Sequence, residues 1–571
     1  MGVFDYRRRI SHAVNIGGTP LGCSYPVRLQ SMTSTSTMDT DASVAQCKRI
    51  AEAGADYVRL TAQGVREAEN IGLIGKNLLA EGVNVPLVAD IHFNPNAATA
   101  AAKVVQKVRI NPGNFVDPGR TFKQLSYTDE EYASEIKKIE TARVPFLNLC
   151  REHGTAIRIG VNHGSLSDRI MSRYGDTPAG MVESAMEFLR VCVACDFTDV
   201  VISIKASNTV IMVETVRRLV KAMEAEGMDF PLHLGVTEAG DGEDGRVKSA
   251  VGIGTLLSEG IGDTIRVSLS EDPEKEIPVA RALVSYIGKR ENAPAIAGEY
   301  APQYDYCAPL RRKTLAIDNI GGENQPIVVA DGDCPELKSD LQADYYNAQD
   351  LVTNGRFVEI DASIPVEVAT RNLLPDQVIV LYSNHVNLTG EMQAWLHAAM
   401  TLGVDNPVVM RVDYGNASYE DVAIMASADL GTMLLNGFRD GVWIRSENLL
   451  TEDIVRLSFG ILQAARLRIT RTEYISCPSC GRTLFDLQSV LKEVKAATSH
   501  LKGLKIGVMG CIVNGPGEMA DADYGYVGAA VGKVSLYKGK NCVMKNIPAD
   551  EAIDYLIDLI KTSGDWTEPQ R

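Results

Sequence analysis

The chain has 571 residues, too many for one ordinary domain, and its 45% hydrophobic and 23% charged residues are the proportions of a globular protein with large buried cores. Its formal net charge of -16 argues against a protein that coats nucleic acid or an anionic membrane, because both need a positive field. No run of eighteen apolar residues is present, and the N-terminal stretch lacks the apolar core of a secretory signal. We therefore expect a cytoplasmic protein with neither nucleic acid nor membrane as a partner.

The first half of the chain alternates short β-branched runs with helical patterns. The predicted strands are 27–32, 57–62, 86–92, 107–113, 156–162, 199–207, 231–238 and 263–270. Strands that alternate with helices in this way predict an α/β protein with an N-terminal (β/α)8 TIM barrel.

Two further patterns follow the barrel. The stretch AGEYAPQYDYC resembles a linker, and four strands after it predict an inserted α/β domain, near 326–332, 356–363, 376–383 and 407–414. The C-terminal pattern predicts a small α+β domain, with strands at 473–477, 505–510, 524–530 and 533–539 and helices at 486–500 and 548–562. We therefore predict three domains, at 1–295, 296–440 and 441–571.

Five predicted barrel strands carry a cation between two apolar residues. The cations are Arg59, Arg109, Arg158, Lys205 and Arg266. Any one of them could point outward and extend under the helices. Five together indicate a ring inside the barrel, and because an unpaired buried ion costs several kcal/mol, such a ring needs an anion at its centre.

Polar side chains gather at the predicted C-terminal ends of the strands, where TIM barrels hold their active sites. They are Asp90, His92, Asn94, Asn111, Asn162, His163, Ser207, Asn208, Thr237, Glu238, Ser268 and Ser270. Arginine also binds phosphate oxygens in a bidentate manner. The lining therefore favours a multiply charged, hydroxylated small molecule such as the diphosphate of a polyol.

Two other motifs are interpreted as structural. GDGEDG at 240–245 has the glycine spacing of a dinucleotide site, but its acidic residues would repel a pyrophosphate and the barrel pattern leaves no Rossmann unit. The pair Cys192 and Cys195 ends a helical pattern with no other donor beside it, which indicates core packing.

Three thiols lie in the C-terminal pattern. ISCPSCGRTLFDL places Cys477 and Cys480 on a tight turn, and MGCIVNGPGE adds Cys511 and, at its end, Glu518. The turn alone leaves zinc, an iron-sulfur cluster and a redox disulfide open. One interpretation is that the thiols anchor a cluster while Glu518, an oxygen ligand that is more easily displaced than a thiolate, protects a reactive iron. In the alternative, Glu518 is a solvated loop acid, and Cys542 or an external thiol is the fourth ligand.

The strings CPSCGRTLFDL, GCIVNGPGE, VRINPGN, IRIGVNHGSL, HLGVTEAG and GIGDTIRVSL resemble the 4-hydroxy-3-methylbut-2-enyl diphosphate synthase family of the methylerythritol phosphate route to isoprenoids. The similarity covers roughly 1–290 and 440–571, and the segment between looks like the extra domain of the larger, three-domain form. The resemblance implies an oxidoreductase that opens the ring of 2-C-methyl-D-erythritol 2,4-cyclodiphosphate and removes a hydroxyl. Two electrons from ferredoxin or flavodoxin would pass through a [4Fe-4S] cluster whose unique iron binds a substrate oxygen.

The resemblance also implies residue roles. The cluster ligands would be Cys477, Cys480, Cys511 and Glu518. The substrate-binding residues would be Arg59, Asp90, Arg109, Asn111, Arg158, Asn162, Lys205, Ser207, Arg266 and Ser268. Glu518 would leave the iron as substrate binds, while Glu238 and His92 are candidates for positioning or proton transfer.

The resemblance is also compatible with a homodimer, because in the shorter form of the family the cluster of one subunit meets the barrel of another. The inserted domain would be a spacer that lets the C-terminal domain close over the barrel. Two other functions fit part of the sequence. One is a barrel methyltransferase with an accessory cluster domain, which needs a pterin or corrinoid site. The other is an electron-carrier or metal-storage protein, which leaves the barrel cations unexplained.

Overall fold

The structure is a computed structural model that describes residues 3–115, 126–332, 341–513, 515–519 and 521–569. The chain forms two compact units. One comprises Arg9–Gly245, Gly262–Arg281 and Arg471–Arg571, and contains the barrel strands and the C-terminal domain. The other comprises Met1–Arg8, Arg246–Ile261 and Ala282–Thr470, and contains the inserted domain. No helix within the described ranges is long and apolar enough to cross a membrane.

The first unit contains a closed, eight-stranded parallel barrel, which confirms the predicted fold class. Its strands are β3 (Arg28–Met32), β4 (Tyr57–Ala62), β5 (Leu87–Ile91), β6 (Lys107–Ile110), β7 (Ala156–Asn162), β8 (Val200–Lys205), β9 (Leu232–Leu234) and β10 (Thr264–Ile265). Each lies inside a predicted run. β10 closes the barrel by pairing with both β3 and β9. β9 and β10 are shorter than the runs that predicted them.

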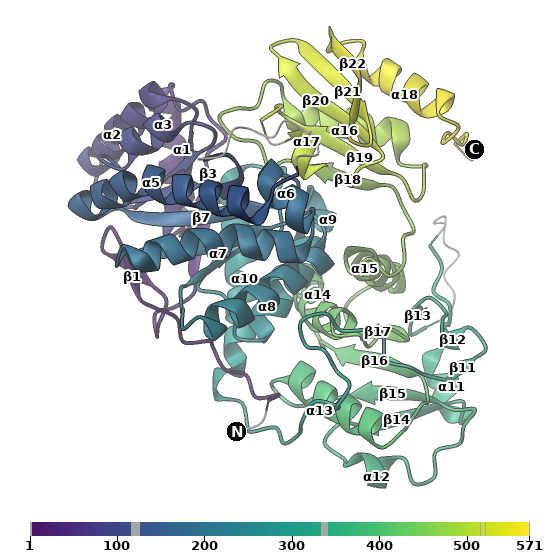
Figure 1. The fold of residues 1–571 in the computed structure, drawn as a ribbon. Coiled ribbons are helices and arrows are strands. Elements are labelled where there is room, and N and C mark those ends of the chain that lie inside the picture. Colours follow the sequence, from purple (N-terminus) through teal and green to yellow (C-terminus); the bar gives the residue numbers. More distant parts are fainter. Residues whose placement is uncertain (1–2, 116–125, 333–340, 514, 520, 570–571) are drawn as a thin grey trace. The chain divides into compact units, whose positions relative to one another are not determined.

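Helices follow the strands as the alternation predicts (Figure 1). They are α1 (Thr40–Glu52), α2 (Val65–Ala80), α3 (Pro95–Ala101), α4 (Pro112–Phe115), α5 (Asp129–His153), α6 (Asp168–Tyr174), α7 (Pro178–Ala194), α8 (Thr209–Ala225), α9 (Gly242–Ser258) and α10 (Glu276–Gly288). The longest, α5, begins at a capping box made by Thr128 and Glu131 and ends at Gly154, whose φ is +63°. Cys192, near the end of α7, is buried as the packing interpretation expects.

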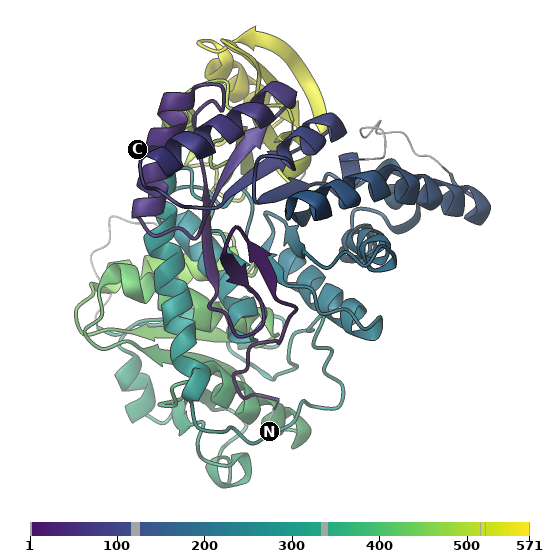
Figure 2. The same ribbon diagram turned by 90° about the vertical axis from the view of Figure 1, so that its left-hand side faces the viewer.

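An N-terminal hairpin covers the end of the barrel at which the strands begin (Figure 2). It consists of β1 (Val14–Ile16) and β2 (Thr19–Leu21) in antiparallel pairing. Its apolar side chains pack with Tyr57, Val88 and Val201 from the barrel strands. The barrel is therefore closed by apolar packing at one end, and its polar side chains meet the pocket at the other.

The inserted domain is built on a five-stranded parallel sheet in the order β13-β17-β16-β15-β14. Its strands are β13 (Ile327–Val329), β14 (Phe357–Asp361), β15 (Val378–Tyr382), β16 (Val408–Asp413) and β17 (Gly441–Arg445), and β11 (Ala316–Ile317) and β12 (Ile320–Gly321) form a separate hairpin. Its helices are α11 (Ala348–Thr353), α12 (Val366–Ala369), α13 (Leu388–Thr401), α14 (Tyr419–Leu435) and α15 (Thr451–Ala464). Sequence reasoning missed β17, although it is as long as β14 and β15, and the predicted division at 440/441 falls directly before this strand. The compact unit continues to Thr470.

A buried charge pair and an aromatic cluster stabilise this second unit. Arg290 and Asp429 form an ion pair with both side chains buried, and the Tyr414 hydroxyl donates to Asp429 at 2.8 Å. His397 lies on α13 among rings that include Phe4 and Tyr304. Burial lowers the pKa of His397 to about 4, so this imidazole is neutral at physiological pH.

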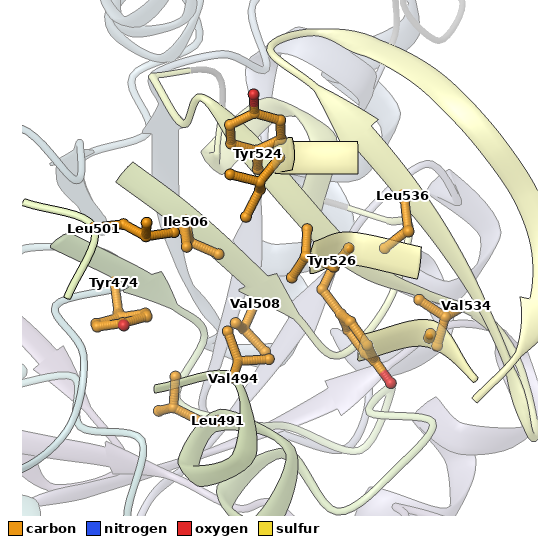
Figure 3. Packing of buried hydrophobic residues seen from close by; sticks show 13 residues of the cluster. Tyr474, Leu491, Val494, Leu501, Ile506, Val508, Tyr524, Tyr526, Val534 and Leu536 are labelled. Atoms are coloured by element: carbon orange, nitrogen blue, oxygen red, sulfur yellow. The ribbon is translucent and has the colours of Figure 1, made fainter. Parts of the chain in front are cut away.

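The C-terminal domain is an α+β domain with one mixed sheet in the order β18-β19-β20-β21-β22. Its strands are β18 (Glu473–Ser476), β19 (Lys505–Met509), β20 (Tyr524–Ala530), β21 (Lys533–Lys538) and β22 (Asn541–Pro548), and its helices are α16 (Leu487–Thr498), α17 (Gly515–Glu518) and α18 (Ala552–Thr562). Figure 3 shows the core between the sheet and α16, where Val494 lies beside Val508 and Tyr526. The edge strand β22 was not predicted, because NCVMKNIP mixes polar residues and proline into its pattern.

Candidate active site

One pocket in the first unit is lined by both the barrel and the C-terminal domain. From the barrel come Met32, Arg59, Asp90, His92, Arg109, Arg158, Asn162, Ser203, Lys205, Thr237, Glu238, Arg266 and Ser268. From the C-terminal domain come Cys477, Pro478, Ser479, Cys480, Arg482, Thr483, Met509, Gly510, Cys511, Gly515 and Glu518. The five strand cations therefore point inward, and the three thiols face the same space. Serine hydrogen bonds also link the two parts, since the Ser270 hydroxyl donates to the Cys477 carbonyl at 3.0 Å.

Two predicted substrate residues lie outside this lining. Asn111 is buried, and its amide donates to the Ser165 hydroxyl at 3.1 Å while accepting from the Gly113 backbone N–H at 3.1 Å. Ser207 is buried after β8. Asn111 shapes the loop beyond β6, and neither side chain is a lining residue of the pocket.

Arg109 is held by a dense set of partners. Its guanidinium donates to Asp90 Oδ1 at 3.1 Å, to the Gly160 carbonyl at 2.8 Å and to Asn162 Oδ1 at 3.0 Å, and it also contacts His92. Burial and the adjacent Arg109 lower the pKa of His92 to about 3, so His92 is a neutral imidazole at physiological pH. The network fixes the guanidinium plane at the C-terminal ends of β5, β6 and β7.

Arg266 is neutralised by a carboxylate beneath the pocket. Nε and Nη2 donate to the two Glu276 oxygens at 2.9 and 2.8 Å, and both side chains are almost fully buried. Burial would lower the pKa of Arg266, but Glu276 outweighs that effect and the pKa is raised. This bidentate pair is satisfied without a ligand.

Arg158 and Lys205 carry charge that the barrel does not offset in the same way. Arg158 is 1% exposed, and its Nε and Nη1 have no hydrogen-bond partner among the described residues. Burial, with Arg59 adjacent, lowers the pKa of both side chains well below the usual range. Arg59 donates to the thioether of Met32 at 3.1 and 2.8 Å, a weak acceptor. The centre of the barrel is therefore electropositive and suited to an anion.

The three thiols converge from two loops. Cys477 and Cys480 follow β18, and Ser479 between them has a φ of +60°, which turns the chain so that both cysteines line the pocket. Cys511 follows β19, and the Gly510 backbone N–H donates to the Cys477 sulfur at 3.2 Å. Burial raises the pKa of the Cys477 thiol well above its usual value and that of Cys511 to about 11.

Glu518 ends α17 and reaches toward the barrel. Asn162 donates to Glu518 Oε1 at 2.6 Å, although 356 residues separate the two in sequence. Burial raises the pKa of Glu518 well above its usual range, and a hydrogen bond with Glu238 acts in the same direction. Glu238 is buried with a φ of +49°, an unusual conformation for this residue type.

A close approach of two glycines places the Glu518 loop. A Cβ added to Gly164, after β7, would lie 2.1 Å from the Gly517 carbonyl oxygen, and Gly164 has a φ of +79°. One added to Gly517 would lie 2.7 Å from the Gly164 carbonyl oxygen. Only glycines allow the two loops to meet at this distance.

Sequence reasoning missed one pocket residue of consequence, Arg482. It lies two residues after Cys480 and is 7% exposed, and its Nη2 is 3.6 Å from Asp90 Oδ2. Its position directly after the thiols, in CPSCGR, is the signal that could have identified it. The Met32 side chain beneath Arg59 carries no signal of this kind.

The fold and the site define a class of protein: a TIM barrel with a cationic anion site that faces a C-terminal domain bearing three thiols. The GcpE TIM-barrel domain model matches residues 11–281, and the model of the GcpE protein C-terminal domain matches residues 473–562. The chain belongs to this family, as the sequence resemblance predicts.

Relatives match along their whole length. The 4-hydroxy-3-methylbut-2-en-1-yl diphosphate synthase (flavodoxin) of Phocaeicola vulgatus is 56% identical, with 100% of both chains covered. The protein of the same name from Bacteroides fragilis is also 56% identical over 100% of this chain and 98% of its own, and that of Akkermansia muciniphila is 44% identical over 99% and 98%. Among solved structures, a Yersinia pestis dihydropteroate synthase matches 48% of this chain and 99% of its own at 14% identity, with a TM-score of 0.32.

Proposed function

We propose that this chain reduces 2-C-methyl-D-erythritol 2,4-cyclodiphosphate to 4-hydroxy-3-methylbut-2-en-1-yl diphosphate with electrons from flavodoxin. Its relatives are named for that product and that donor. The observation that carries the proposal is the single pocket in which an electropositive barrel face meets three thiols and Glu518. Neither a methyltransferase nor an electron carrier accounts for both halves of this pocket.

The barrel cations suit the charge change of this reaction. The bond from carbon 2 to a phosphate oxygen breaks, the hydroxyl on carbon 3 leaves as water, and a double bond forms between these carbons, with two electrons and one proton consumed when the freed phosphate oxygen stays ionised. Opening the cyclic diphosphate frees a phosphate oxygen and so adds negative charge. Arg158 and Lys205, which lack an offsetting carboxylate like that of Arg266, are placed to stabilise that charge.

The donor set fits an iron-sulfur cluster. No three Cys, His, Asp or Glu side chains in the described part of the chain are arranged to hold a single metal ion. Cys477, Cys480 and Cys511 nevertheless line one pocket, and the Gly510 N–H donates to sulfur as backbone amides do around such clusters. A polynuclear group, whose ligands stand further apart, suits this set. We propose that the three thiols and Glu518 hold a [4Fe-4S] cluster, which when bound would deliver the electrons.

The other pocket residues have positioning or proton-transfer roles in this proposal. His92 is neutral, so it orients Arg109 and does not act as an acid. Asn162 gives the Glu518 carboxyl a partner on the barrel whenever Glu518 is not a ligand. Glu238, beside Glu518, remains the candidate for supplying a proton. In this proposal the barrel and the C-terminal domain of one chain build the pocket.

Anaerobic turnover tests the proposal directly. Cluster-reconstituted protein is given the cyclodiphosphate with reduced flavodoxin or a low-potential viologen, and the product is identified by mass. We expect the diphosphate product with both reductants. An intact cluster without product from either reductant would refute the proposed substrate.

Glu518→Ala tests the role of the carboxylate. We expect it to retain a cluster by its visible and EPR spectra, because the three thiols remain, and to lose most turnover. Glu493→Ala, an exposed acid on α16 of the same domain, is the matched control. An unchanged rate for Glu518→Ala would refute a functional role for this side chain.

A further inference from the structure

Arg482 is the one basic side chain that the described residues of the C-terminal domain contribute to the pocket. Its Nη2 donates to the backbone oxygen of Asp90 at 3.3 Å and lies 3.6 Å from Asp90 Oδ2, at the end of β5. The two residues are 392 positions apart in sequence. A side chain two residues from a thiol of one domain therefore contacts the barrel of the other.

Arg482 lies between an acid and the thiols. Its side chain is 7% exposed, its Nη2 lies 3.6 Å from Asp90 Oδ2, and it lines the same pocket as Cys480 and Cys511. A buried guanidinium is stable only where negative groups offset its charge. Here those groups are the Asp90 carboxylate and the thiols, which carry negative charge when they bind a metal.

Asp90 links Arg482 to the anion site. The same carboxylate accepts from Arg109 at 3.1 Å through Oδ1, while Oδ2 faces Arg482. A second ion pair ties the two domains at the surface, where Arg471 lies 2.6 Å from Asp244 with both side chains partly exposed. That pair joins the same two domains but lies away from the pocket, which makes it a matched control.

We propose that Arg482 is a positioning residue that holds the C-terminal domain on Asp90 of the barrel and supplies the positive charge that offsets the thiolates of the cluster site. The inference rests on the proposed function, since it assigns a role toward the cluster. A fixed cation beside a cluster favours its more negative, reduced state. Removing the charge should make the cluster harder to reduce and loosen the contact between the domains.

The experiment compares Arg482→Gln, Arg482→Lys and Arg471→Gln in the full chain. The first readout is the midpoint potential of the reconstituted cluster in an anaerobic, EPR-monitored titration. We expect a shift to more negative potential in Arg482→Gln, little shift in Arg482→Lys, which keeps the charge, and none in Arg471→Gln. Equal potentials in Arg482→Gln and Arg471→Gln would overturn the charge role.

The second readout needs no cluster. Cluster-free protein is digested with a low concentration of protease, and the rate of cleavage near Arg471, where the C-terminal domain begins, is followed. We expect faster cleavage in both Arg482 variants than in wild type, because lysine cannot reproduce the reach of the guanidinium to Asp90. An unchanged rate would overturn the tethering role. If wild-type protein binds no cluster, the proposed function fails instead, and digestion still tests the tether. If Arg482→Gln does not fold, Arg482→Lys is compared with wild type on its own. We expect it to keep the wild-type potential, because the charge remains, and to be cleaved faster than wild type.

Discussion

Replacing Arg158 with methionine should stabilise the ligand-free protein while it weakens anion binding. Arg158 is 1% exposed inside the barrel, its Nε and Nη1 have no partner among the described residues, and Arg59 adds repulsion. Methionine has a similar length, is uncharged and adapts to irregular gaps. The substitution therefore removes a charge that the ligand-free fold does not compensate.

The gain follows from the cost of burying charge. Replacing buried ionic groups with apolar side chains of similar volume stabilises proteins by about 1 to 4 kcal/mol. Each kcal/mol raises the melting temperature of a domain of this class by roughly 2 to 4 °C. We expect a rise of several degrees in the calorimetric transition of the cluster-free barrel.

The loss in binding follows from the same side chain. Two N–H groups of Arg158 are available to phosphate oxygens, and hydrogen bonds to charged groups contribute about 1.5 to 3 kcal/mol each. Their removal should weaken the binding of the cyclodiphosphate to cluster-free protein by about 10²- to 10⁴-fold in isothermal titration.

Arg266→Met is the matched control, and we expect it to lower the stability that Arg158→Met raises. It leaves Glu276 buried without its bidentate partner, which typically costs about 3 to 5 kcal/mol. The melting temperature should fall in this variant and rise in Arg158→Met. A fall in both, or undiminished anion binding by Arg158→Met, would refute the argument that Arg158 is held ready for a ligand.

Two further predictions concern a loop contact and a buried histidine. Gly164→Ala should lower turnover by on the order of 10- to 100-fold with an unchanged far-UV circular dichroism spectrum, because its Cβ would displace the Gly517 backbone. Gly154→Ala is the control, since Gly154 also has a positive φ but no atom within 4 Å of an added Cβ, and its turnover should not fall. Equal turnover in the two variants would contradict the positioning role of Gly164. His397→Phe should remove an acid-induced loss of stability. The wild-type imidazole has a pKa of about 4 in the folded protein and about 6.5 in the unfolded chain. The free energy of unfolding therefore falls by about 3 kcal/mol as the pH drops from 6.5 to 4, and it is unaffected above pH 7. Urea unfolding at pH 7 and pH 4.5 checks this, and the same pH dependence in both proteins would refute it.

The regular elements of this protein are determined by local sequence. Short apolar runs predicted every barrel strand, because a strand that is buried on both faces needs a nearly continuous apolar run. One exception has a local reason: β22 is an edge strand with few apolar residues, so it carries too little pattern to be recognised. The other, β17, is as long and as buried as the predicted strand β15, so its apolar run was a signal that could have been used.

The chemistry of the site was partly predictable for the same reason. Arg59, Arg109, Arg158, Lys205 and Arg266 recur at one height on successive strands, and the barrel brings that height to one pocket. The three cysteines share short loops at strand ends, so their approach also follows from the sheet.

Only the tertiary structure decided which of these charges are paired. The cation Arg266 has Glu276 beneath it, Arg158 does not, and Asn162 meets Glu518 across 356 residues. Asn111 and Ser207 share the strand-end pattern yet lie outside the pocket. Periodicity fixes which face of an element a residue occupies, but partners from distant elements are set by how barrel and C-terminal domain pack. Burial then gives each pairing its energetic weight.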